Sequence, residues 1–152
     1  MSDTQSKTAI RTSSKVLTTE YDVMFDRNFS NPNEHQEEAF VMRQAGAGDL
    51  VNIRINSGGG ALVTLSAFQN IMKNSEAHFH AILEGDASSA ASMLFLLADT
   101  QEVGDYAEMM VHQAQVGYES HIQGFKGAGD MISSKNAKIM TDVYKDFLTE
   151  AE

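Results

Sequence analysis

The fold is decided by residues 53–112, within which stand Ile55-Asn56-Ser57-Gly58-Gly59-Gly60, Gly85-Asp86-Ala87-Ser88-Ser89-Ala90-Ala91-Ser92-Met93 and Met109-Met110-Val111-His112-Gln113. Each piece adjoins an apolar run that is typical of a buried strand. In chain order, the three pieces offer backbone amides for an oxyanion, a hydroxyl nucleophile and a histidine base. These are the groups that acyl transfer needs.

The glycine run follows a predicted buried strand, residues 51–56, and leads into a predicted helix. Glycine reaches positive φ and lets a ligand or another backbone come close. The amides of Gly58, Gly59 and Gly60 can therefore point into a cleft. The same residues also fit an ordinary turn between a strand and a helix.

The serine piece follows a strand predicted over His78–Glu84, which Gly85-Asp86 is expected to break. A helix is expected from Ser88 or Ser89 through Leu97 or Ala98. A serine at a helix start lies beside free backbone amides and a partial positive charge. It also fits a simple N-cap, but the alanines around it leave room for a substrate.

His112 closes a strand predicted over Met109–Gln113. The carboxyl ends of parallel strands are where the active-site groups of open α/β sheets usually lie. A half-buried histidine with a structural role fits the same position. His78 and His80 share one face of their strand, but no third metal ligand stands near them in the sequence.

Together the three pieces resemble the proteolytic subunit family of the Clp protease (ClpP), and most closely its phage-encoded head maturation branch. The glycine piece is similar to the family's Ile-Asn-Ser-Pro-Gly-Gly, with Gly58 in place of the proline. The serine piece is similar to the phage-type Ala-Ala-Ser-Ala-Ala-Ser. The third piece is similar to Met-Ile-His-Gln, although Ala114 replaces the proline that follows. The resemblance extends from about Leu17 to the end of the chain.

The resemblance implies a serine endopeptidase that hydrolyses extended or unfolded polypeptides, in phage capsid maturation or in protein turnover. It assigns the nucleophile to Ser89 and the general base to His112. It assigns the oxyanion hole to the backbone amides of Gly60 and Ala90. The glycine loop would bind the substrate through Ser57, Gly58 and Gly59. No metal or organic cofactor is implied.

The order of elements predicts an α/β fold, and the resemblance implies that it is of the ClpP/crotonase type. Strands alternate with helices, which implies right-handed crossovers and a mostly parallel sheet. The expected elements are strands at 21–25, 50–56, 78–83, 101–103 and 109–113, and helices at 34–45 and 61–74. Residues 121–149 are expected to form a long helix, whose first third is weakened by three glycines. In the family this region is a protruding handle helix by which two rings meet.

Composition narrows the classes of function. The chain has 152 residues, which suits one domain, and a formal net charge of −10, which argues against a nucleic-acid-binding surface. It has no cysteine, no signal-peptide core and no run of the ~20 apolar residues that a membrane helix needs. A cytoplasmic protein is expected, in the host cytoplasm if it is phage-encoded. Residues 1–16 are expected to be a flexible tail, and 17–152 a ClpP-like protease domain.

The expected partners follow from the resemblance. They are a polypeptide substrate, further copies of the chain in a ring of seven, and either an ATP-dependent unfoldase or capsid proteins. Two other functions remain open: a catalytically inactive ClpP-like assembly subunit, and a crotonase-type acyl-CoA enzyme.

A serine–histidine pair of this type usually has an aspartate that orients the histidine. In the family, that residue follows the handle, so the expectation is that it lies beyond residue 152 and that the domain lacks its C-terminal part. Asp130, Asp142 and Asp146 are expected to project away from His112. Peptidase activity of this chain is therefore expected to be very low.

Overall fold

The structure, a computed structural model, describes residues 18–112, 122–144 and 147. The elements are β1 (Glu20–Phe25), the 3-10 helix η1 (Pro32–His35), α1 (Gln36–Gln44), β2 (Leu50–Ser57), α2 (Leu62–Lys73), β3 (His78–Ser88), α3 (Ala90–Leu96), β4 (Thr100–Val103), β5 (Glu108–Met110) and α4 (Ile122–Tyr144).

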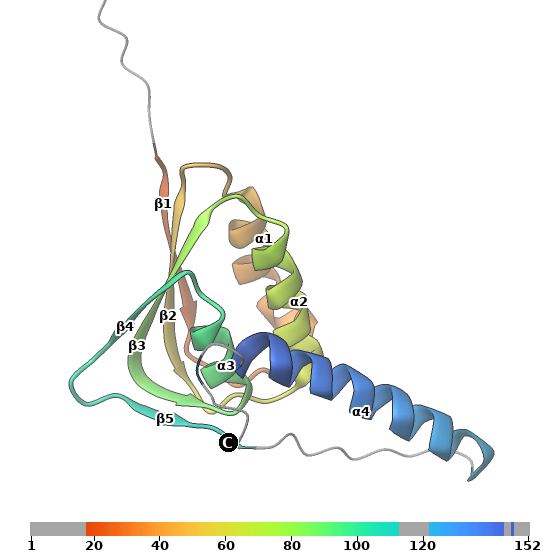
Figure 1. The fold of residues 1–152 in the computed structure, drawn as a ribbon. Helices are drawn as coiled ribbons and strands as arrows, with labels where there is room; N and C mark the ends of the chain where they lie inside the picture. Colours follow the sequence, from red (N-terminus) through yellow and green to blue (C-terminus); the bar gives the residue numbers. More distant parts are fainter. Residues whose placement is uncertain (1–17, 113–121, 145–146, 148–152) are drawn as a thin grey trace, which may run out of the picture.

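The sheet has the order β1-β2-β3-β4, and every one of its strand pairings is parallel. Strand β5 pairs with β3 beyond the end of β4, over Asp86–Ser88. Figure 1 shows α1, α2 and α3 stacked on one face of the sheet. The predicted α/β fold with a mostly parallel sheet is confirmed.

The core lies between this sheet and its helices. Alternate residues of β1, β2 and β3 point toward the helices and are buried, as the period of a strand requires. Phe25, Ile53 and Leu83 are such residues, and they meet Leu65 and Phe68 of α2 in one buried cluster. Nearly all of α3 is buried as well, so the helix that follows the serine cluster is fixed inside the fold.

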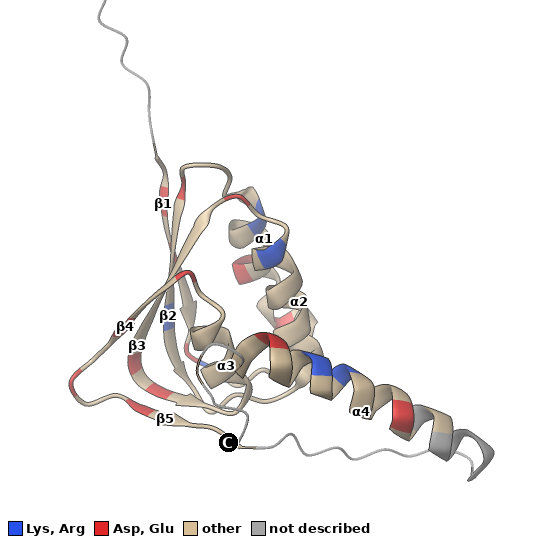
Figure 2. Ribbon diagram, in the orientation of Figure 1, with Lys and Arg blue, Asp and Glu red and all other residues tan. Residues whose placement is uncertain are grey.

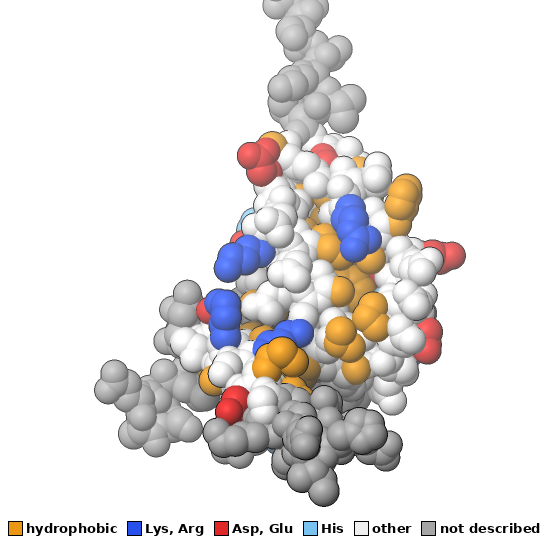
Figure 3. Space-filling model, turned by 90° about the vertical axis from the view of Figure 1, so that its right-hand side faces the viewer, with side chains coloured by type: hydrophobic (Ala, Val, Ile, Leu, Met, Phe, Trp, Pro, Cys, Tyr) orange, Lys and Arg blue, Asp and Glu red, His pale blue; other side chains and the backbone are white. Residues whose placement is uncertain are grey.

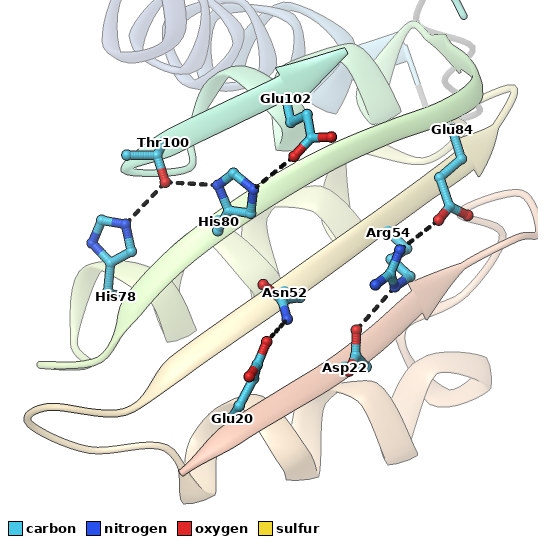
Figure 4. A network of polar contacts seen from close by, with 9 residues as sticks. All are labelled: Glu20, Asp22, Asn52, Arg54, His78, His80, Glu84, Thr100 and Glu102. Atoms are coloured by element: carbon cyan, nitrogen blue, oxygen red, sulfur yellow. Dashed lines mark hydrogen bonds and ion pairs between the residues drawn. The ribbon is translucent and has the colours of Figure 1, made fainter. Parts of the chain in front are cut away.

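The opposite face of the sheet carries polar side chains that bond to one another across the strands (Figure 4). Arg54 on β2 bridges Asp22 on β1 and Glu84 on β3, at 2.9 and 2.7 Å. His78 and His80 both contact the hydroxyl of Thr100 on β4, at 2.9 and 2.8 Å. These contacts link the four strands on the face that the helices leave open.

Helix α4 is the protruding handle (Figure 1). Its carboxyl-terminal part packs on the body, where Ile139, Val143 and Tyr144 are buried. Its earlier part extends away, and Met131 is 68% exposed. Within the part of the chain that the structure describes, none of the helices combines the length and the apolar character needed to span a bilayer.

Three predicted boundaries were wrong. Gly85-Asp86 does not break the third strand, because β3 continues through it to Ser88. The strand predicted over Met109–Gln113 already ends at Met110, and Gln113 lies outside the described residues. The helix predicted from Glu34 begins instead as a 3-10 turn at Pro32, capped by the side chain of Asn31. The predicted tail, residues 1–16, also lies outside the described residues.

Candidate active site

Ser89 occupies the sharp turn between β3 and α3. Its φ and ψ are 55° and −122°, and it is the one non-glycine residue with positive φ in the described parts of the chain. Such a conformation costs about 1–3 kcal/mol, so it persists only where the surroundings impose it, often at functional sites. A strained turn between strand and helix is also how α/β-hydrolases expose their nucleophilic serine, although the Gly-x-Ser-x-Gly motif is absent here.

The three serines of this region differ in what their hydroxyls do. Ser88 is buried and donates to Asp86 Oδ1 at 2.6 Å. Ser92 is fully buried and donates to the carbonyl oxygen of Ser89 at 2.6 Å. Ser89 is partly exposed and makes no capping hydrogen bond to its helix. Of these three serines, only Ser89 is partly exposed, so it is the candidate nucleophile.

The glycine loop lies directly against this turn. A Cβ on Gly59 would stand 2.2 Å from the Ser88 carbonyl oxygen and 2.8 Å from the Ala90 nitrogen. Gly59 has a φ of 81°, so both its conformation and its contact require glycine. The contact places Gly59, the residue before the predicted oxyanion donor Gly60, against the amide nitrogen of Ala90, the other predicted donor.

The hydrogen bonds of the loop show which amides are already engaged. The Gly59 amide donates to Ser57 Oγ at 3.1 Å, and the Ser57 hydroxyl donates to the Arg27 carbonyl oxygen at 2.8 Å. Ser57 is buried, so its hydroxyl holds the loop in shape rather than facing solvent. Within the described residues, the Gly60 amide has no acceptor. The Ala90 amide opens α3, where a helix offers no acceptor of its own.

A bulge of three residues in β3 sets where the serine turn lies. Ile55 pairs with Leu83, but Ser57 pairs with Ala87, so three residues of β3 stand opposite Asn56 alone. The Asn56 side-chain oxygen accepts from the Asp86 amide at 3.1 Å, and a Cβ on Gly85 would stand 2.4 Å from it. Bulges of this kind redirect side chains next to active sites.

Strand β5 brings His112 to the same edge of the sheet. Ser88 pairs with Met110, and the Ser89 amide donates to the Met110 carbonyl oxygen at 2.8 Å. His112 lies two residues further on and is half-buried. The predicted nucleophile and the predicted base thus follow the last paired residues of two neighbouring strands.

The candidate acids on the handle differ in position. Asp142 lies beside Ala77 and Phe79 at the amino end of β3, whereas Ser89 follows its carboxyl end. Lys138 donates to Asp142 at 2.8 Å. Asp130 is exposed on the protruding part of α4, and Asp146 lies outside the described residues. The identity of the residue that orients His112 stays a prediction.

Several residues that shape this site were missed by reasoning from the sequence. Phe29 bridges to Gly60, and a polar cluster of Arg27, His35 and Glu38 lies behind it. The sequence signal at Arg27–Phe29 is weak, since the segment resembles an ordinary turn. Elsewhere in the described residues, no three His, Asp or Glu side chains converge as metal ligands would.

The parallel sheet, its helix layer and the protruding handle define an α/β protein with a ClpP-like fold. The model of the Clp protease family matches residues 7–150, which is nearly the whole chain. The chain therefore belongs to the Clp protease family, a family of peptidases that generally form oligomeric rings. No curated protein matches the chain.

Proposed function

We propose that this chain is a serine endopeptidase that cleaves extended or unfolded polypeptides, with Ser89 as nucleophile and His112 as general base. The observation that carries the proposal is the turn at Ser89. Its backbone is strained, the residue is partly exposed, and the hydroxyls of Ser88 and Ser92 are engaged in hydrogen bonds. Membership of the Clp protease family supports peptidase chemistry at this turn.

The reaction proceeds by acyl transfer. His112 takes the proton of the Ser89 hydroxyl, and Ser89 Oγ attacks the peptide carbonyl carbon. The amides of Gly60 and Ala90 hold the oxyanion, and His112 returns the proton to the leaving amine. Water then attacks the acyl-enzyme by the same route and frees Ser89. Loss of one oxyanion donor typically lowers the rate by about 10²–10³.

The glycine loop suits an extended substrate. An added strand beside Gly58 and Gly59 would bind through backbone hydrogen bonds, which carry little sequence preference. We propose that copies of the chain form a ring of seven, as the family resemblance implies. Capsid maturation in a phage-infected cytoplasm, or turnover with an ATP-dependent unfoldase, are the settings that fit this activity.

A fluorophosphonate probe tests the proposal. It should label the wild-type protein on one serine, and mass spectrometry should map the adduct to Ser89. Ser89→Ala should abolish labelling, whereas Ser88→Ala and Ser92→Ala should retain it. Labelling that persists in Ser89→Ala would contradict the assignment. An unlabelled wild-type protein that still assembles would favour the inactive assembly subunit instead.

A further inference from the structure

His35 is a buried polar residue that the proposed reaction does not use. Its side chain is 0% exposed and packs against the rings of Phe25, Phe29 and Phe68, with centroids 5.6–5.9 Å apart. Its Nδ1 has no hydrogen bond within the described residues. A buried polar atom without a hydrogen bond is costly, and an apolar ring would suit this cluster better. The residue therefore needs another explanation.

The contact of the other ring nitrogen, Nε2, explains why a histidine is buried here. His35 Nε2 lies 3.3 Å from the Asn28 carbonyl oxygen, and because a carbonyl only accepts, Nε2 is assigned the proton. The Asn28 carbonyl and the Phe29 amide belong to one planar peptide unit. That Phe29 amide donates to the Gly59 carbonyl oxygen at 2.7 Å. Hydrogen bonds at both ends thus fix the rotation of a single peptide plane.

This peptide plane is in direct contact with the glycine loop. The Phe29 carbonyl oxygen accepts from the Ala61 amide at 2.6 Å, so Phe29 holds the chain on both sides of Gly60. A Cβ on Gly60 would stand 2.6 Å from that same carbonyl oxygen, which shows how closely the two segments pack. Rotation of the plane would release the Gly59 carbonyl and let Gly60 turn.

Two charged residues connect His35 to the surface. Glu38 Oε1 lies 3.6 Å from His35 Nδ1 and accepts from the Arg27 guanidinium. Arg27 also donates to the Glu34 carbonyl oxygen at 2.7 Å, which joins it to the start of the helix layer. The Arg27 carbonyl oxygen accepts from Ser57, at the other side of the glycine loop. The cluster thus reaches the loop through two separate contacts.

We propose that His35, supported by Glu38 and Arg27, is a positioning residue for the oxyanion hole. It locks the Asn28–Phe29 peptide plane so that the Gly60 amide stays aimed at the oxyanion formed on Ser89. The inference rests on the proposed function of Ser89. It assigns His35 no contact with the substrate.

The test replaces the donor and then restores it. His35→Phe fills the aromatic cluster but removes the hydrogen bond to the Asn28 carbonyl. His35→Gln returns a donor at nearly the position of Nε2. Fluorophosphonate labelling should slow about tenfold or more in His35→Phe, since a small misplacement in an active site is costly. His35→Gln should recover most of the rate. With a peptide substrate, kcat should fall and KM should change little.

A second pair of variants covers the case in which His35→Phe does not fold. Arg27 is about half exposed, so Arg27→Met keeps the aliphatic stem without opening the core. It should slow labelling, and Arg27→Lys should restore part of the rate. Ile71→Val, in the same helix layer at the far end of α2, is the control for a general loss of stability.

Amide hydrogen exchange separates the two proposals. His35→Phe and Arg27→Met should increase exchange at Phe29 and Ala61, and Ile71→Val should not. Absence of labelling in the wild-type protein overturns the proposed function, while exchange still tests the positioning role. Wild-type labelling rates in both variants, or an equal loss in Ile71→Val, would overturn the inference about His35.

Discussion

The backbone of Ser89 has a conformation that is energetically unfavourable for a residue with a side chain. A φ of 55° suits glycine, yet a side chain is present there and is partly exposed. The contacts that impose this conformation are the hydrogen bond to Met110 and the packing of Gly59 against the turn. In the proposed reaction, stability and reactivity therefore oppose each other at Ser89.

Replacing Ser89 by glycine should relieve the strain. We expect Ser89→Gly to unfold at a higher denaturant concentration than Ser89→Ala, by about 1 kcal/mol in unfolding free energy, because only glycine adopts this conformation without cost. Both variants should lose labelling, so activity cannot explain the difference. Equal stability of the two would show that the turn is unstrained.

Asp49 gives a prediction about pH. Its carboxylate accepts from the Gly46 amide at 2.9 Å and from the Thr19 amide at 2.8 Å. These hydrogen bonds, that of Gly46 first, lower the pKa of Asp49 below its ordinary value of 3.8. The resulting stabilisation is fully present above that ordinary value and is lost as the pH falls through the lowered pKa.

The measurement compares the wild-type protein with Asp49→Asn in urea. The wild-type protein should have the higher midpoint at neutral pH, and the gap should stay constant down to about pH 4. The gap should then narrow as the acid becomes protonated in both states. A gap that widens in acid would reverse the assigned direction.

At the scale of elements, the glycine loop is the most constrained part of the site. Its three glycines are not equivalent. Gly59 and Gly60 have positive φ, whereas Gly58 does not. Gly58 also stands where the family motif has proline, and its amide has no acceptor among the described residues.

We therefore expect opposite results from two substitutions in this loop. Gly58→Pro should raise the unfolding free energy by about 0.4–1 kcal/mol, because proline restricts the unfolded chain and Ser57 before it is already extended. Gly59→Ala should destabilise by about 3 kcal/mol or more, since its Cβ would overlap the Ser88 carbonyl oxygen. Thermal unfolding of both variants tests the pair. A destabilised Gly58→Pro would mean that its amide is needed.

The sequence predicted which segments are helices and which are strands more reliably than it predicted where each begins and ends. The alternation of strands and helices was enough to predict the parallel sheet, because each crossover obeys the same handedness. Gly85-Asp86 looked like a break because glycine and aspartate are rare inside strands. The strand continues there because Asn56, thirty residues earlier, bonds to the Asp86 amide. A local pattern contains no information about such a contact.

The candidate site was also predictable only in part, because some of its residues stand in sequence motifs and others are defined by contacts between distant segments. Ser89, His112 and the glycines stand in motifs with fixed spacing, so a resemblance was enough to predict them as site residues, and their roles stay predictions. His35, which Glu38 and Arg27 support, contacts the carbonyl oxygen of Asn28, a backbone group that any residue would provide. Their role depends on a peptide orientation that only the folded chain defines. The engagement of the Ser88 and Ser92 hydroxyls likewise appears only in three dimensions.

Across the whole molecule, charge and exposed apolar groups are unevenly distributed. Figure 2 shows acidic residues along β4, β5 and the turn between them, where Glu102, Asp105 and Glu108 lie. Figure 3 shows hydrophobic side chains among basic ones on the helix-covered side. Phe40 and Val63, on α1 and α2, are 63% and 56% exposed. Apolar groups on a surface of this kind suit contacts with other chains.

The protruding part of the handle is expected to contact other copies of the chain. Met131 is exposed on the part of α4 that leaves the body. We expect light scattering to give a mass several times that of the monomer, and Met131→Glu to lower this mass without changing the thermal midpoint of the fold. Ser133→Glu is the control, because two residues along a helix turn the side chain by about 200°. A strictly monomeric wild-type protein would contradict the proposed assembly.

The three-residue bulge in β3 also limits which changes in length this chain tolerates. Removing one residue between Leu83 and Ala87 would displace the following segment by about 3.3 Å and exchange its inward and outward side chains. The helix α3 is nearly all buried and cannot follow such a shift. Substitutions in this short segment leave the spacing intact, whereas single-residue insertions and deletions do not. A deletion scan should therefore find lost function concentrated there, while the exposed turn at 104–106 should accept the same changes.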